Sequence, residues 1–178
     1  MKRNELEHAV RAAGAIVGRA ELLIIGSQAL HASVPGSLPD AALRSVEVDI
    51  AVFDDAEGRI ADLIDGSIGE GSMFHSTFGY YAQGVVAATA ILPSGWRDRL
   101  VRFETPATNG VVGWCLEPHD LWVAKAIANR PKDVEFCDAL LRAGLVERNR
   151  LAERLGAVDG IDSALRDLVE QRIAAAPR

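Results

Sequence analysis

The sequence has few cysteines and no long apolar run. These two absences argue against a disulfide-rich protein, a zinc protein and a membrane protein. Its two cysteines, Cys115 and Cys137, lie among apolar residues, and no Cys/His cluster has zinc-site spacing. The simplest interpretation is a cytoplasmic protein with reduced, buried thiols. No stretch approaches the roughly 20 apolar residues that a membrane span needs. The first residues also lack the continuous apolar segment of a signal peptide, so we expect no membrane partner.

An excess of basic residues is missing as well. The formal net charge of the 178 residues is −6, whereas bulk binding to nucleic acid normally needs a strongly basic surface. Local contacts with a polyanion stay open, because basic residues gather in two groups. The two groups are Arg97, Arg99 and Arg102, and Lys125, Arg130 and Lys132. An equally good interpretation of each group is a solvated helix face.

Apolar residues make up 49% of the chain, which is enough for a core. Hydrophobic periodicity predicts strands at 21–25, 45–53, 80–92, 100–104 and 110–116. It predicts helices at 4–18, 28–32 and 57–64, and then, after Pro118, only helices, at 118–129, 131–143, 147–156 and 161–174. Residues 66–79, rich in Gly and Ser, read as a mobile loop. The fold predicted is α+β: a mixed sheet flanked by helices over residues 1–117, with residues 118–178 as a helical region packed on it in one compact unit.

Two carboxylates stand in the clearest predicted strand. Between Ser45 and Phe53 apolar and polar residues alternate, so Glu47 and Asp49 share a face. Ionised carboxylates about 5 Å apart repel by roughly 3 kcal/mol at an effective dielectric constant near 20. A divalent cation removes this repulsion, and Mg²⁺ prefers carboxylate and phosphate oxygens. The pair therefore predicts a metal clamp, although an ordinary strand with an acidic polar face has the same pattern.

A glycine-serine turn follows the first predicted strand. Gly26 lets a phosphate approach the backbone, and the Ser27 hydroxyl and the helix N-terminus that follows can donate to an anion. Such turns are common, so this one alone predicts little. Together with the acidic pair, it predicts a site that holds a nucleoside triphosphate and its Mg²⁺.

These residues also carry a family resemblance. Gly26-Ser27, followed about twenty residues later by Glu47-Val48-Asp49, resembles the glycine-serine and paired-acid motif of the polymerase-β-type nucleotidyltransferase superfamily. The stretch LWVAKAIANRPKDVEFCDAL, residues 121–140, resembles the Lys-x4-Arg-x-Lys-Asp helical signature of nucleotidyltransferase toxins from abortive-infection and toxin–antitoxin systems. The resemblance covers roughly residues 20–141.

The resemblance implies transfer of a nucleoside monophosphate from a nucleoside triphosphate, with Mg²⁺ or Mn²⁺ as cofactor and pyrophosphate leaving. In the toxin branch the acceptor is the 3′ end of tRNA and a cognate antitoxin is the partner; other branches modify a protein hydroxyl or a small molecule. Two positions depart from the pattern. Glu47 stands where the superfamily usually has aspartate. The third carboxylate, usually on a later strand, has Asp98 and Glu104 as its nearest candidates, and Glu104 is the candidate metal ligand because it lies on a predicted strand.

The resemblance implies roles for most of the remaining site residues, and Ser45 is added because it lies on the same predicted strand face as the two acids. Glu47 and Asp49 would act as catalytic metal ligands, and Lys125 would offer its charge to the triphosphate. Asp133 would orient Lys125 or position the acceptor, while Arg130, Lys132 and the Ser45 hydroxyl would contact phosphates. For Arg130, Lys132 and Asp133 the alternative is a salt-bridge network between helices. For the protein as a whole there are two alternatives. One is a non-catalytic nucleotide-binding or protein-interaction module on the same scaffold, and the other is a structural protein whose acidic face binds a basic partner.

Overall fold

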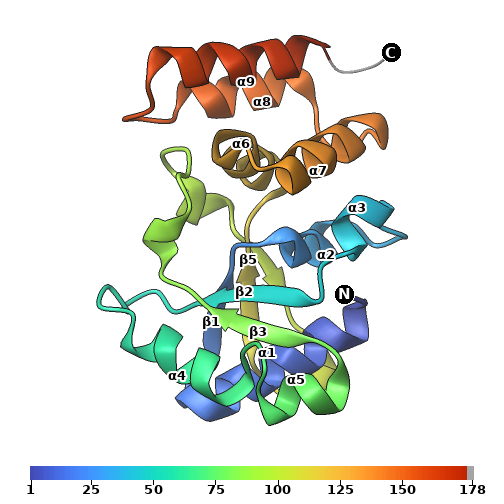
Figure 1. Cartoon of the computed structure of the whole chain (residues 1–178), viewed down its shortest axis with the longest axis vertical. Helices are drawn as coiled ribbons and strands as arrows, with labels where there is room; N and C mark the ends of the chain where they lie inside the picture. The colour runs from blue at the N-terminus through green and yellow to red at the C-terminus, as the bar shows by residue number, and fades with distance from the viewer. Residues whose placement is uncertain (176–178) are drawn as a thin grey trace.

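The computed structural model describes residues 1–175, and it confirms the α+β fold (Figure 1). At its centre is a five-stranded mixed sheet in the order β3-β2-β1-β5-β4. The strands are β1 (Glu21–Ile24), β2 (Glu47–Ala51), β3 (Tyr81–Gly84), β4 (Val101–Phe103) and β5 (Val112–Cys115). β1 pairs with β2 in antiparallel fashion and with β5 in parallel fashion. β3 runs parallel to β2, and β4 runs antiparallel to β5.

Helices lie on both sides of this sheet. Helices α1 (Arg3–Val17), α4 (Arg59–Ile68) and α5 (Met73–Phe78) lie together below the sheet in Figure 1. Above it lie α2 (Leu30–Ser33), α3 (Asp40–Leu43), α6 (Pro118–Ala128) and α7 (Pro131–Arg142), and then, outermost, α8 (Arg148–Gly156) and α9 (Ser163–Ala175). Short 3₁₀ turns occur at η1 (Ser27–Ala29), η2 (Ala87–Thr89), η3 (Trp96–Arg99) and η4 (Pro106–Thr108).

The buried apolar side chains form one cluster that extends from α1 through the sheet to α9. In α1, Leu6, Val10 and Ala13 recur at helical spacing and are completely buried. A fully buried leucine or valine contributes about 1.5–3 kcal/mol to the free energy of unfolding. In α6, the buried Trp122 donates its indole N–H to the carbonyl of Cys137 at 3.0 Å. This bond fixes α6, which carries Lys125, against α7, which carries Lys132.

The predicted loop at 66–79 is wrong. Helix α4 continues to Ile68, and α5 occupies Met73–Phe78. The Ser72 hydroxyl accepts the His75 N–H at 3.1 Å and so caps the start of α5. Gly79, with a φ of 78°, ends it in the left-handed conformation. The prediction failed because the residues that cap this six-residue helix, a serine and a glycine, are also typical of loops.

The predicted strand at 80–92 is too long. Only Tyr81–Gly84 is a strand, and the chain then turns through η2. β3 lies at the edge of the sheet and pairs only with β2, which ends at Ala51. Beyond the bond from the Val85 N–H to the carbonyl of Ile50, β3 has no further partner strand. The apolar residues that follow pack against the core without joining the sheet.

The state of the two cysteines and the length of the apolar helices can be compared with the predictions from the sequence. Cys115 and Cys137 are both buried and free, as predicted, and burial raises the pKa of the Cys137 thiol to about 12. Across residues 1–175, none of the helices combines the length and apolarity needed to cross a bilayer.

Candidate active site

The acidic pair lies where β1 ends beside β2. The Ile25 N–H donates to the carbonyl of Asp49 at 3.2 Å, which brings the glycine-serine turn against the acidic strand. Gly26 has an extended backbone, with φ −91° and ψ −171°, so no left-handed conformation requires glycine here. Proximity requires it instead: a Cβ at position 26 would overlap Asp49 Oδ2 and lie 2.9 Å from Asp49 Cγ. The Asp49 carboxylate occupies the space in which a side chain at position 26 would lie.

Replacing Gly26 with alanine should therefore displace the Asp49 carboxylate while leaving the fold intact. The backbone conformation suits alanine, which by itself adds about 0.4–1 kcal/mol of stability. We expect chemical denaturation to give a nearly unchanged free energy of unfolding and isothermal titration to give an at least tenfold weaker Mn²⁺ affinity. Gly36→Ala is the matched control, because a Cβ there meets nothing within 4 Å. Equal Mn²⁺ affinities of the two variants would contradict this role of Gly26.

Glu47 is held by two partners from other elements. β3 pairs with β2 so that Tyr81 lies opposite Glu47, and the Tyr81 hydroxyl donates to Glu47 Oε2 at 3.1 Å. Lys132 Nζ, at the start of α7, lies 3.3 Å from Glu47 Oε1. Burial, and then the hydrogen bond to Glu47, raise the pKa of Tyr81 to about 12. Tyr81 is therefore protonated at neutral pH and acts as a donor to the Glu47 carboxylate.

Asp49 is in a different environment. Within residues 1–175 no hydrogen bond or ion pair involves its carboxylate. Burial, and after it the negative charge of Glu47, raise the pKa of Asp49 above its ordinary value, although Lys125, Lys132 and Arg130 partly oppose the shift. The two carboxylates thus share a face, one compensated by nearby donors and the other lacking a bonded partner.

The basic residues of the Lys-x4-Arg-x-Lys-Asp stretch gather around Asp133. The side chain of Asp133 is 0% exposed and contacts Lys125 Nζ at 3.1 Å and Arg130 Nε at 2.5 Å. Burial alone would raise the pKa of Asp133, but the Arg130 hydrogen bonds and the Lys125 charge lower it. Asn129, with a φ of 52°, separates α6 from α7, so the stretch spans a turn between two helices, as the sequence predicted. Asp133 positions both cations at the edge of the acidic pair.

A buried glutamine, Gln28, forms hydrogen bonds with both Ser27 and Ser45. Gln28 Nε2 donates to Ser27 Oγ at 3.3 Å and to the carbonyl of Ser45 at 3.4 Å. β2 begins only at Glu47, so Ser45 precedes the strand, and its hydroxyl accepts the Glu47 N–H at 3.1 Å. The helix expected after Ser27 is a 3₁₀ turn followed by the four residues of α2. It is too short for a strong dipole, so the hydroxyls and the nearby cations would be the main donors to a bound anion.

A cleft with two lobes opens around these residues. One lobe has a volume of about 490 Å³ and the other about 350 Å³. Five charged residues line both lobes and form the boundary between them: Glu47, Asp49, Lys125, Arg130 and Lys132. Ser27, Ser45 and Arg44 line only the smaller lobe. We call the smaller one the polar lobe and the larger one the apolar lobe. Both lie between the β1–β2–β3 side of the sheet and helices α6 and α7.

Comparison with protein families agrees with this geometry. Residues 4–169 match a family described as "Nucleotidyltransferase of unknown function (DUF6036)". The chain belongs to this family. Comparisons with curated proteins and with solved structures gave no match. The family membership supports the nucleotidyltransferase resemblance, whereas the abortive-infection and toxin–antitoxin branch stays a proposal.

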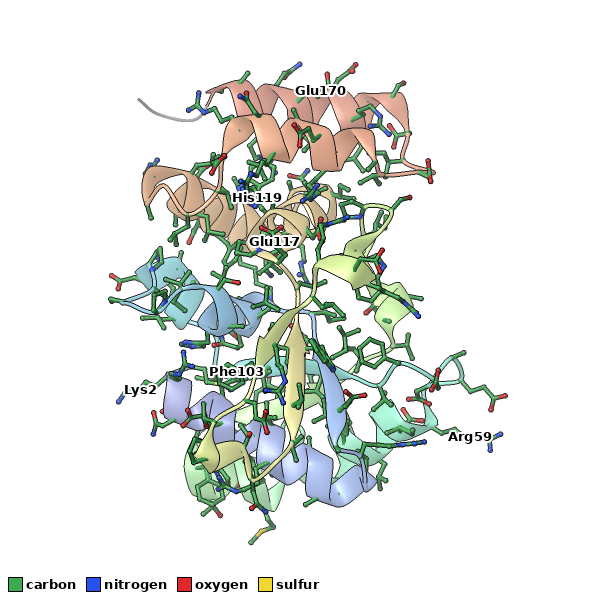
Figure 2. The ribbon with its side chains drawn as sticks, turned by 180° about the vertical axis from the view of Figure 1, so that it is seen from behind. Lys2, Arg59, Phe103, Glu117, His119 and Glu170 are labelled. Carbon is green, nitrogen blue, oxygen red and sulfur yellow. The ribbon has the colours of Figure 1, made fainter. Side chains whose placement is uncertain are left out.

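In this member of the DUF6036 family the structure does not bring Glu104 to the acidic pair. Glu104 follows β4, at the sheet edge opposite β3, and forms an ion pair with Arg102. The register puts Phe103 level with Leu22 of β1, whereas the site lies beyond the other end of β1. Figure 2 shows Phe103 in the half of the molecule away from the C-terminal helices. Glu104 is therefore separated from Asp49 both across and along the sheet.

The neighbour of Asp49 on β3 is an amide. Gln83 lies opposite Asp49 in the parallel β2–β3 ladder and lines the apolar lobe. In the described part of the chain no group of three or more Asp, Glu, His or Cys side chains could hold a metal by itself. Glu47 and Asp49 offer hard oxygen donors, and the space at Gly26 accommodates the Asp49 carboxylate. Such a pair fits a divalent cation whose remaining ligands are phosphate oxygens and water.

Three residues of the candidate site were not predicted from the sequence. Tyr81 and Gln83 are placed by the β2–β3 register, and Gln28 by its burial between the two serines. Alternation along β3 could have indicated that Tyr81 and Gln83 share a face. Nothing in the sequence aligns that face with Glu47 and Asp49.

Proposed function

We propose that this protein transfers a nucleoside monophosphate from a Mg²⁺-bound or Mn²⁺-bound nucleoside triphosphate to an acceptor hydroxyl. One observation carries the proposal: the acidic pair of β2 and the cations of residues 125–132 line the same cleft beside the Gly26–Ser27 turn. Membership of a nucleotidyltransferase family supports it. The metal, when bound to Glu47 and Asp49 with the nucleotide, would neutralise phosphate charge during transfer.

The chain's own residues then have separable roles. The Ser27 and Ser45 hydroxyls and the cations at the boundary orient the β- and γ-phosphates in the polar lobe. Lys125, which is 15% exposed, reaches the cleft while Asp133 fixes its ammonium group. Its charge stabilises the negative charge that develops on the leaving pyrophosphate. Asp133 is a positioning residue in this scheme, because its carboxylate is fully buried behind Lys125 and Arg130.

Lys132 has two competing partners in this scheme. In the nucleotide-free structure its ammonium group lies on Glu47, yet its side chain is 62% exposed and free to move to a phosphate. We therefore expect Lys132→Ala to bind Mn²⁺ about two- to fivefold more tightly without nucleotide, because a competing cation is removed. The same variant should bind a nucleoside triphosphate more weakly. Isothermal titration measures both affinities.

The matched control for Lys132 is Arg44→Ala. Arg44 lines the same lobe but pairs with Glu135, at 2.6 Å, rather than with the acidic pair. Its loss should leave the Mn²⁺ affinity unchanged. An unchanged or weaker Mn²⁺ affinity in Lys132→Ala would show that Lys132 does not compete for Glu47.

The function is tested directly by incubating the protein with Mg²⁺, each α-labelled nucleoside triphosphate, and either total RNA or a panel of small alcohols. We expect label to enter an acceptor and this labelling to be lost in Asp49→Ala. The resemblance makes the 3′ end of tRNA the RNA acceptor to examine, and an antitoxin would be found as an inhibitor of labelling. No thermal stabilisation by any Mg²⁺–nucleotide pair would exclude the enzymatic proposal.

A non-catalytic nucleotide-binding module is the second candidate. The observation that favours it is Gln83, a neutral amide where β3 faces Asp49, together with Glu47 in place of an aspartate. An amide orients a hydroxyl but does not accept its proton. Nucleotide binding without transfer to any acceptor would favour this candidate.

A further inference from the structure

The apolar lobe of the cleft has no assigned occupant. Apart from the five shared residues at the boundary, none of the residues described in its lining is charged. Most of that lining is aliphatic, including Ile25, Val85, Ile91, Leu121, Ile127 and Leu165. Gln83 and Thr89 are its main polar side chains. At about 490 Å³ the lobe has the size and lining of a small-molecule site.

The position of the lobe relative to the acidic pair indicates which reactant it holds. The hydroxyls that can orient phosphates, Ser27 and Ser45, line only the polar lobe. Phosphoryl and nucleotidyl transfer place the attacking and leaving oxygens roughly in line, on opposite sides of the phosphorus. With the leaving pyrophosphate in the polar lobe and the α-phosphorus at the boundary, the attacking oxygen enters from the apolar lobe.

We propose that the acceptor is a small molecule whose hydroxyl is carried on an uncharged, apolar body seated in the apolar lobe. This inference rests on the proposed nucleotidyl transfer. The hydroxyl oxygen forms a bond to the α-phosphorus, and the bond from that phosphorus to the bridging oxygen of the β-phosphate breaks. Pyrophosphate leaves, and the hydroxyl proton passes to solvent. The product is a phosphodiester of the alcohol and the nucleoside.

Charge decides against an RNA acceptor. An RNA 3′ end carries phosphates close to its attacking hydroxyl, and binding them requires cations along their path. The cations of the cleft stand at the boundary, where Asp133 and Glu47 already pair with them. Beyond the boundary the lobe offers aliphatic walls, and the whole chain has a net charge of −6. The walls favour apolar surface, at about 25 cal/mol for each Å² removed from water.

The test uses 2-naphthalenemethanol, a neutral fluorescent alcohol, and two alanine-to-leucine variants. Ala128 lines only the apolar lobe, at an exposed position in the last turn of α6, and Ala41 lines only the polar lobe. Fluorescence anisotropy measures alcohol affinity, isothermal titration measures Mg²⁺–nucleotide affinity, and an α-labelled nucleotide measures transfer to the alcohol or to total tRNA. Ile91→Asp, at the exposed rim of the apolar lobe, is a second variant that does not depend on tight packing.

We expect Ala128→Leu and Ile91→Asp to weaken alcohol binding about tenfold or more and to leave nucleotide affinity unchanged, with Ala41→Leu giving the reverse. Alcohol binding that is absent, or equal in all proteins, overturns the inference. Weaker nucleotide binding in Ala128→Leu overturns it as well, because the lobe then holds the base. Transfer of label to tRNA but not to the alcohol also overturns it. A wild-type protein that binds no nucleotide at all would instead refute the proposed function.

Discussion

Asp49→Asn should reduce nucleotidyl transfer about a thousandfold or more and at the same time stabilise the metal-free protein. The loss of transfer is expected because the amide would remove one of the two proposed anionic metal ligands, and a bound metal would supply several kcal/mol of charge stabilisation. The gain in stability follows from the raised pKa of Asp49, since burial and the Glu47 charge make its ionised form unfavourable in the folded state. We therefore expect this one substitution to lower the transfer activity while it raises the stability of the metal-free protein.

The sign of the pH dependence follows from the same shift. The unfolded chain titrates Asp49 near its ordinary pKa of 3.8, and the folded protein titrates it higher. Stability from this group is therefore present below about 3.8 and is lost as the pH rises through the folded pKa. Without metal, the melting temperature of Asp49→Asn should exceed that of the wild type at pH 7, and the difference should shrink toward pH 4. Added Mn²⁺ should stabilise the wild type but not Asp49→Asn.

Thermal denaturation in chelator and in Mn²⁺, at both pH values, measures this pattern. Asp54→Asn is the control, because Asp54 is an exposed carboxylate just after β2 and away from the cleft. It should behave as the wild type in every condition. A variant at Asp49 that keeps transfer activity, or that is still stabilised by Mn²⁺, would remove Asp49 from the site.

Asp120→Ala should lower the free energy of unfolding by about 3–5 kcal/mol. The Asp120 side chain is 0% exposed and accepts hydrogen bonds from Arg99 Nε at 2.8 Å and Nη2 at 3.0 Å. Arg154 Nε lies 3.1 Å from Asp120 Oδ1, the oxygen that also accepts from Arg99 Nη2. Removal of the Asp120 carboxylate leaves two guanidinium groups, 24% and 23% exposed, without their shared partner. Denaturation by urea measures the loss.

A surface ion pair gives the contrasting control. Arg59 and Glu57 form a pair in which both side chains are largely exposed, at 84% and 73%. Arg59→Ala should leave the free energy of unfolding within about 0.5 kcal/mol of the wild type. A loss at Asp120 as small as that at Arg59 would show that the Asp120 contacts contribute little.

The same aspartate joins the core to the C-terminal helices. Arg99 ends η3, Asp120 lies in the first turn of α6 and Arg154 in α8. Glu117 and His119, labelled in Figure 2, lie where the chain enters these helices. His119 Nε2 accepts the Glu147 N–H at 2.9 Å, just before α8 begins. The segment between β3 and η3 forms part of the apolar lobe, so this network also holds one wall of the cleft.

Local pattern was sufficient to predict the parts of the site that depend on local chemistry. The alternation around Glu47 and Asp49 predicted β2, and the Gly26–Ser27 turn was expected at the end of β1, where the structure has it. Pro118 and Pro131 predicted the starts of α6 and α7. These predictions succeeded because each depends on residues within a few positions of one another.

The parts that depend on register could not be predicted. Glu104 lies on a predicted strand, but only the order of strands shows that β4 is at the far edge of the sheet. Likewise, only the parallel pairing of β3 with β2 places Gln83 opposite Asp49. Pairing between distant strands is determined by packing of the whole core, which a single sequence does not display.

The charge pattern of the cleft has a consequence for the order in which the proposed site assembles during synthesis. Its carboxylates come from β2, whereas the cations that oppose them come from residues 125–132. A ribosome-bound chain that has emerged only as far as β5 carries the acidic pair without those counter-charges. Because translation exposes the chain from its N-terminus, the proposed site is complete only after α7 has left the exit tunnel.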